Sequence, residues 1–109
     1  MTTWKYAKIS SYQTHHRIWF YCTDALVMQQ LSQALLAMDP GIKNETSKTK
    51  GKTASERYRD SHFVQFGNCD AFSVVTWLIE QLGAQGWEPF AETVDREGVD
   101  TISLRCRVG

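Results

Sequence analysis

The sequence predicts an α+β fold in which a mostly antiparallel sheet carries two helices packed on one face, in the order β-β-α-loop-β-α-β-β. Two apolar stripes at helical spacing predict the helices, because side chains three and four residues apart share one face of a helix. Alternation of apolar and polar residues over 101–108 predicts the last strand. A chain of 109 residues supports one core, and we expect a single domain over residues 1–109.

Two strands open the chain. Residues 4–9 combine aromatic and β-branched side chains, and residues 10–14 follow as a turn. The segment Arg17–Cys22 is the stronger strand, because its three aromatic residues and one β-branched residue fit a pleated surface. Large side chains occur on both of its faces, which favours a central position in the sheet.

A helix follows the second strand. Thr23 or Asp24 caps it, since a short side-chain oxygen accepts a hydrogen bond from an otherwise unpaired backbone N–H. Residues 39–41, Asp-Pro-Gly, end it, because proline cannot continue a helix and glycine allows the turn. The predicted inner stripe consists of Val27, Leu31, Ala34, Leu35 and Met38.

Residues 43–60 are predicted to form a mobile basic loop. The segment holds six cations against three anions and almost no apolar residue, so it has little to bury that would offset the entropy cost of ordering. A loop of this length in a small domain is either functional or disordered. Its candidate ligand-binding cations are Lys50, Lys52 and Arg57.

The second helix begins at Asn68 or Asp70, after a short strand at residues 62–66. Gly83 and Gly86 are the two candidates for the left-handed residue that ends it without steric cost. Trp87 then folds back over the end of the helix as the chain enters the sheet, and we expect it to be buried. The inner stripe of this helix consists of Ala71, Val74, Val75, Leu78 and Leu82.

The last two strands form a hairpin around a turn at residues 95–98. Residues 87–94 are extended, and Pro89, which lacks a backbone donor, favours an edge position or a bulge. Glu88 and Glu92 fall on one face of that strand, where we expect a solvated row rather than an acid–base pair. In the last strand Ile102, Leu104, Cys106 and Val108 point to one side, and Thr101, Ser103, Arg105 and Arg107 to the other.

The segment WLIEQLGAQGWE at residues 77–88 resembles the signature L-x-x-L-G-x-x-G-W-E of a family of small uncharacterised bacterial domains. Those domains begin with an aromatic, lysine-containing strand, as residues 4–9 do, and end on a strand of alternating hydrophobic and basic residues. The resemblance covers about the last forty residues. This chain departs from the family at Pro89 and in the helix and loop of residues 24–60. The resemblance implies a compact α+β fold and brings no activity with it.

Composition limits the classes of function. Twelve basic residues balance twelve acidic ones, which argues against nucleic acid or a membrane surface as the partner. Cys22, Cys69 and Cys106 form no C-x-x-C pair, and we expect them to be free, small core residues. The N-terminal residues lack the long apolar segment of a signal peptide, and no apolar run reaches membrane-spanning length, so we expect a cytoplasmic protein.

Motifs for catalysis or metal binding are weak. The GKT segment at residues 51–53 lacks the glycine, the strand and the helix of a phosphate-binding loop. His15 and His16 point to opposite faces of an extended segment, so at most one serves a given site, and we expect no metal or other cofactor. Cys69 lies beside a helix start, which lowers thiol pKa values, but Asp70 opposes this. An enzyme is therefore only the third interpretation.

Trp77 carries the leading hypothesis, a non-enzymatic association module that forms a homodimer. This residue lies between the apolar stripe and the solvent face of its helix, where a large ring gains little in a monomer. Aromatic side chains are enriched at the energetic centre of protein interfaces, and we expect Trp77 at the subunit contact. An unprotected sheet edge is the other candidate surface.

The alternative is a binder of a small anionic or nucleotide-like ligand through aromatic and arginine side chains. Its ligand-binding candidates are Trp77, Arg105, Arg107, Lys50, Lys52 and Arg57. We expect Trp19 and Trp87 in the core, which leaves Trp4, Tyr6, Tyr21, Trp77 and Phe90 as candidates for an exposed aromatic platform beside Arg105 and Arg107.

Overall fold

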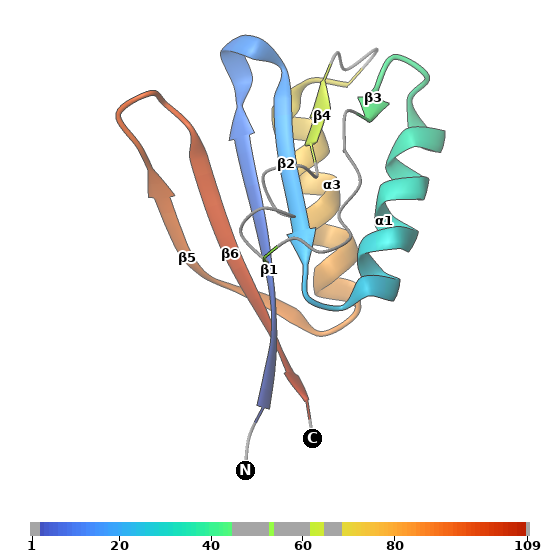
Figure 1. The fold of residues 1–109 in the computed structure, drawn as a ribbon, viewed down its shortest axis with the longest axis vertical. Helices are drawn as coiled ribbons and strands as arrows, with labels where there is room; N and C mark the ends of the chain where they lie inside the picture. Colours follow the sequence, from blue (N-terminus) through green and yellow to red (C-terminus); the bar gives the residue numbers. More distant parts are fainter. Residues whose placement is uncertain (1–2, 45–52, 54–61, 65–68, 109) are drawn as a thin grey trace.

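A six-stranded antiparallel sheet, in the order β3-β4-β2-β1-β6-β5, carries two 14-residue helices on one face (Figure 1). The computed structural model describes residues 3–44, 53, 62–64 and 69–108. The elements are β1 (Thr3–Tyr12), a 3₁₀ turn (Gln13–His15), β2 (Arg17–Cys22), α1 (Ala25–Met38), β3 (Lys43–Asn44), β4 (His62–Val64), α3 (Ala71–Ala84), β5 (Trp87–Val94) and β6 (Asp100–Val108). The predicted fold class is confirmed, with the short strand β3 as an addition to the predicted order.

β1 is longer than predicted and lies inside the sheet. It pairs with β2 on one side and β6 on the other, and both registers continue to Ser11 or beyond. The turn predicted at residues 10–14 is therefore wrong at its start, because Ser10 and Ser11 are buried between two partner strands. The chain turns later, where His16 adopts a left-handed conformation with a φ of 50°.

Asp24 caps α1 and attaches the helix to the sheet. One carboxylate oxygen accepts hydrogen bonds from the backbone N–H groups of Leu26 and Val27. The other oxygen accepts from the Lys5 ammonium of β1 at 2.9 Å. The same carboxylate thus satisfies free backbone donors of the helix and pairs with a charge on the sheet.

The buried stripe of α1 is narrower than predicted. Val27, Leu31 and Leu35 are buried, whereas Ala34 and Met38 are exposed. The three buried residues are spaced four apart and form one row along the helix. This row faces β2, the strand that α1 mainly contacts.

Asp39 joins the end of α1 to the start of α3. This residue is 2% exposed, and its carboxylate accepts hydrogen bonds from the backbone N–H groups of Gly41 and Cys69, at 3.0 and 2.9 Å. Its backbone carbonyl also accepts from the N–H of Ile42. Because a buried carboxylate needs such donors, residues 39–42 are held beside residue 69.

α3 agrees with the predicted stripe, since all five of its predicted inner residues are buried. Asp70 caps the helix by accepting a hydrogen bond from the Ser73 backbone N–H at 2.7 Å. Gly83 lies inside the helix, and Gly86, with a φ of 91°, is the left-handed residue that follows it. Trp87 comes next and is 4% exposed, as predicted.

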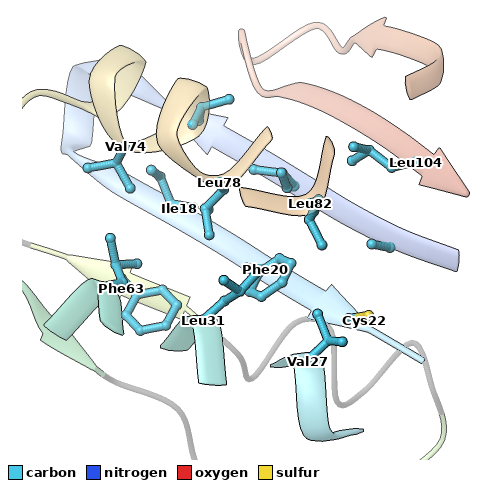
Figure 2. Packing of buried hydrophobic residues seen from close by; sticks show 14 of the residues in the cluster. Ile18, Phe20, Cys22, Val27, Leu31, Phe63, Val74, Leu78, Leu82 and Leu104 are labelled. Carbon is cyan, nitrogen blue, oxygen red and sulfur yellow. The ribbon is translucent and has the colours of Figure 1, made fainter. Parts of the chain in front are cut away.

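The core fills the layer between the helices and one face of the sheet. Figure 2 shows Ile18 and Phe20 of β2 pointing into this layer, which Leu31 of α1 and Leu78 of α3 close from the other side. Trp19 points to the opposite face by alternation and is half-buried there. Its predicted place in the core is therefore wrong.

β5 is an edge strand and contains a bulge, so both of the alternatives predicted from Pro89 are present. The pairing with β6 shifts between Pro89 and Ala91. Every residue of β5 after Trp87 is exposed, because the β5–β6 hairpin extends beyond the two helices (Figure 1). At its tip, the Asp95 carboxylate accepts hydrogen bonds from the backbone N–H groups of residues 97 and 99.

The predicted basic loop at residues 43–60 falls mostly outside the described residues. Lys43 and Asn44 form β3 and pair with β4, and Thr53 is exposed. Residues 45–52 and 54–61, which include three of the candidate cations, are not described.

Candidate ligand-binding face

The face of the sheet opposite the helices, called the open face below, collects aromatic and basic side chains. Because side chains alternate along a strand, the register identifies them. Even-numbered residues of β1 point to this face, and they pair with odd-numbered residues of β6. The aromatic and basic residues of β1, β2 and β6 on this face are Trp4, Tyr6, Lys8, Tyr12, Arg17, Trp19, Tyr21, Arg105 and Arg107.

Arg105 lies at the centre of an aromatic cluster on the open face. Its guanidinium carbon is 4.5 Å from the centroid of the Trp4 ring and 5.2 Å from that of the Phe90 ring. Its Nε donates a hydrogen bond to Glu88 Oε1 at 2.9 Å. Tyr6 meets Phe90 edge-on, with ring centroids 6.1 Å apart. We call these five residues the Arg105 cluster.

The Arg105 cluster holds the Arg105 guanidinium in one orientation and leaves it accessible to a ligand. The Arg105 side chain is 40% exposed. A guanidinium has five N–H donors, and the hydrogen bond to Glu88 uses the one on Nε. The terminal donors have the geometry to bind a carboxylate or phosphate with two hydrogen bonds. Tyr6 and Phe90 are each 47% exposed, so their rings can stack on a flat ligand.

The bulge in β5 decides which side chains join this cluster. Glu88 pairs with Arg105 before the bulge, and Ala91 pairs with Ser103 after it. Both partners are on the open face, so the extra residue changes the phase of the alternation and sends Glu92 to the helix side, opposite Ile102. The prediction that Glu88 and Glu92 share a face is wrong for this reason.

A second feature of the open face is a hollow of about 350 Å³ beside the two hairpin turns. Its lining residues are Tyr12, His15, Arg17, Trp19, Glu97 and Val99. The Tyr12 and His15 rings meet edge-on, 4.6 Å apart. This volume is in the range of small-molecule sites, and two large rings with one arginine suit a flat anionic ligand. We call it the turn hollow.

The helix side of the hairpin has a different character. A groove of about 480 Å³, called the α3 groove below, is lined by Ile79, Pro89, Phe90, Ala91, Glu92 and Ile102. A hydrogen bond with Asp100 and the negative charge of Asp100 raise the pKa of the Glu92 carboxyl. The Oδ1 atom of Asp100 is buried and has no hydrogen-bond partner among the described residues. The two like-charged carboxyls therefore lie close together beside an apolar surface.

The candidate residues from the sequence divide between two sides of the sheet. Arg105 and Arg107 lie together on the open face. Trp77 lies on α3, which packs on the other face, and it is partly buried against the core. Lys50, Lys52 and Arg57 are outside the described residues. The structure therefore does not bring Trp77 and the two arginines into one site.

Sequence reasoning missed Arg17 and Tyr12, which belong to the turn hollow. Alternation in the first two strands was the available signal. Arg17 lies two residues before Trp19 in β2, so both side chains point to the open face. Tyr12 lies six residues after Tyr6 in β1, so these two side chains also share that face. The early end assigned to the first strand concealed the position of Tyr12.

Two of the three cysteines have raised thiol pKa values. Burial raises the pKa of the Cys22 thiol to about 11. Burial and the carboxylate of Asp39 also raise the pKa of Cys69, which disfavours a nucleophilic thiolate. In the described ranges, no three histidine, cysteine or acidic residues lie close enough together to hold a metal ion.

Comparison with known protein families, with curated proteins and with solved structures found no match. Neither helix in the described part of the chain is long and apolar enough to span a bilayer. The geometry of the open face therefore provides the grounds for a functional proposal.

Proposed function

We propose that this protein binds a small anionic ligand with a flat aromatic ring, of the nucleotide type, on the open face. The observation that carries the proposal is Arg105, which is held between the rings of Trp4 and Phe90 and remains accessible. A fixed guanidinium loses little side-chain entropy when it binds a phosphate. The exposed rings beside it offer stacking to the aromatic part of the same ligand.

Self-association through the open face is the weaker explanation for these side chains. A two-fold dimer places the same surface of both copies together. Lys8, Arg17 and Arg107, all exposed on this face, would then be buried between the two copies. Charged residues are depleted in the centre of stable interfaces for this reason, whereas an anionic ligand complements them.

A direct test is isothermal titration calorimetry with thymidine monophosphate, with thymidine and inorganic phosphate in parallel. We expect the monophosphate to bind more tightly than either part alone. Arg105→Gln should weaken binding by roughly tenfold or more, because a hydrogen bond to a charged group contributes about 1.5–3 kcal/mol. A variant with the same change in net charge, Gln33→Glu on the exposed surface of α1, should bind as the wild type does. Undiminished binding by Arg105→Gln would contradict the proposal.

Homodimer formation with Trp77 at the contact stays a separate prediction. Trp77 is partly buried against the core, so only part of its ring is free for a partner. Trp77→Glu should convert a dimer into a folded monomer, measured by native mass spectrometry with circular dichroism as the folding control. A monomeric wild type would exclude this association.

A further inference from the structure

We infer that the open face binds single-stranded nucleic acid, with several bases stacked along it. This inference rests on the proposed function and names the class of ligand. Its basis is the presence of two aromatic–arginine groups on the same face. The Arg105 cluster lies toward one end of β1, and the turn hollow lies at the other end.

The two groups are too far apart for one small ligand. Tyr6 of the Arg105 cluster and Tyr12 of the turn hollow lie on the same face of β1, six residues apart. At the rise of a β-strand this separation is roughly 20 Å. A mononucleotide contacts only one of the groups, whereas a strand of nucleotides repeats its base and phosphate and reaches both.

Aromatic and basic side chains also lie between the Arg105 cluster and the turn hollow. Lys8 and Tyr21 are direct partners in the pairing of β1 with β2, and Lys8 is exposed. Ser10, which is buried, bonds to Thr101 through their hydroxyl groups at 2.7 Å. Trp19 is the partner of Ser10 in β2. Rings and cations therefore extend from the Arg105 cluster to the turn hollow.

Basic residues outnumber acidic ones on the open face, although the two balance in the composition. The neutral total argued against nucleic acid, but Lys8, Arg17 and Arg107 are all exposed on the open face. Two carboxyls share this face, Glu88, which bonds to Arg105, and Glu97 in the turn hollow. Glu92 and Asp100 of the hairpin lie on the helix side. Cations that follow the backbone and rings that stack with successive bases are the two requirements for binding a single strand.

The preference for a single strand follows from the rings. Bases in a duplex are already stacked and paired, so their faces are closed to Tyr6, Phe90 or Trp19. Phosphate contacts alone would attract a duplex as well as a single strand. A difference between the two forms therefore measures the contribution of the aromatic side chains.

The test is fluorescence anisotropy with labelled oligothymidylate and oligouridylate of about ten nucleotides, a length within the usual range for single-strand sites. A duplex of equal length and unlabelled thymidine monophosphate serve as competitors. We expect at least one oligonucleotide to bind tenfold or more tightly than the monophosphate and the duplex. With three exposed cations in contact, the logarithm of the binding constant should fall with the logarithm of salt concentration with a slope of about −2.

Variants at the two ends separate an extended ligand from a compact one. Arg107→Gln and Arg17→Gln should each weaken oligonucleotide binding and reduce the salt slope by about 0.7. Tyr12→Leu should weaken it about fivefold or more through lost stacking, while monophosphate binding at the Arg105 cluster is unchanged. Gln33→Glu again controls for net charge, and circular dichroism checks folding.

The outcomes distinguish this inference from the proposed function. If thymidine monophosphate binds and the oligonucleotides bind no better, the inference is overturned and the proposed function stands. If neither binds, both are overturned. Equal affinity for single strand and duplex, or sensitivity to substitutions at only one end, also overturns the inference.

Discussion

Charged side chains have different neighbours on the two faces of the β5–β6 hairpin. On the open face, Arg105 bonds to Glu88 and lies against two rings. On the helix side, Glu92 lies beside Asp100, a residue of its own sign. Arg105 and Glu88 have neighbours of opposite charge, whereas Glu92 and Asp100 each have a neighbour of the same sign. The same hairpin thus stabilises a charge on one face and destabilises charge on the other.

This difference shows that a single β-bulge can determine which side chains lie on each face of a sheet. Without the shift between Pro89 and Ala91, the alternation that places Glu88 beside Arg105 would place Glu92 on the open face as well. A further carboxylate there would weaken the attraction of that face for anions. The following predictions test how this arrangement is held in place.

The largest effect is expected from Trp87→Ala, which removes the buried side chain that anchors the start of the hairpin. Trp87 is 4% exposed, and the Lys5 ammonium lies 5.4 Å from its ring. Truncation should cost about 3–5 kcal/mol, a large part of the stability of a small domain. Urea denaturation followed by circular dichroism measures this loss.

The matched control is Phe72→Ala on α3, because Phe72 is 66% exposed. Its effect should stay within about 0.5 kcal/mol. A wild-type unfolding midpoint for Trp87→Ala would show that the hairpin does not depend on this anchor.

An intermediate effect is expected from a pair of glycine substitutions at the junction of α3 and β5. Gly86→Ala should destabilise the protein by about 1–2 kcal/mol, because φ is 91° and a left-handed conformation is unfavourable for alanine. The added Cβ would meet only Cys106 Sγ, at 3.9 Å, so crowding contributes little. Gly83→Ala, inside the helix and in open space, should stabilise by about 0.5–1 kcal/mol. Thermal unfolding that moves in the same direction for both variants would contradict this assignment.

The smallest effect is expected from neutralising one carboxylate on each face of the hairpin. The raised pKa of Glu92 means that the folded state holds its proton more tightly than the unfolded state. Glu92 therefore favours folding below its unfolded pKa, near 4.5, and this contribution is lost as pH rises through the folded pKa. Glu92→Gln should raise the melting temperature at pH 7 by a few degrees at most and have less effect near pH 4.

Glu88→Gln is the comparison on the open face. Glu88 is paired with Arg105, so its removal should be neutral or cost up to about 1 kcal/mol at pH 7. If the two variants shift the melting temperature at pH 7 in the same direction, the two faces do not differ as described.

Local patterns in the sequence predicted the elements and several of their ends. The inner stripe of α3 and the alternation of β6 follow from neighbouring residues. The sequence offers two cap candidates for each helix, of which Asp24 and Asp70 are the caps, and Pro89 favours an edge or a bulge, both of which β5 has. Ser10 and Ser11 were assigned to a turn because small polar residues favour turns. In the fold, pairing on both sides keeps them in β1.

The candidate site was less predictable because it depends on distant pairing. Trp4 and Arg105 come from opposite ends of the chain and meet only through the pairing of β1 with β6. The sequence identified Arg105, Arg107 and the aromatic residues as candidates, but it did not show that Trp4 and Phe90 lie against Arg105. Pro89 indicated a bulge without showing which later residues would change face.

The buried carboxylate of Asp39 has a consequence for engineering the chain. It holds residues 41 and 69 next to each other through two backbone hydrogen bonds, so the ends of the intervening segment are already closed. Lengthening a closed loop is inexpensive, since each doubling adds only about 0.6 kcal/mol of closure entropy. A guest peptide placed between Gly41 and Cys69 would therefore add little closure entropy, because these two residues stay next to each other.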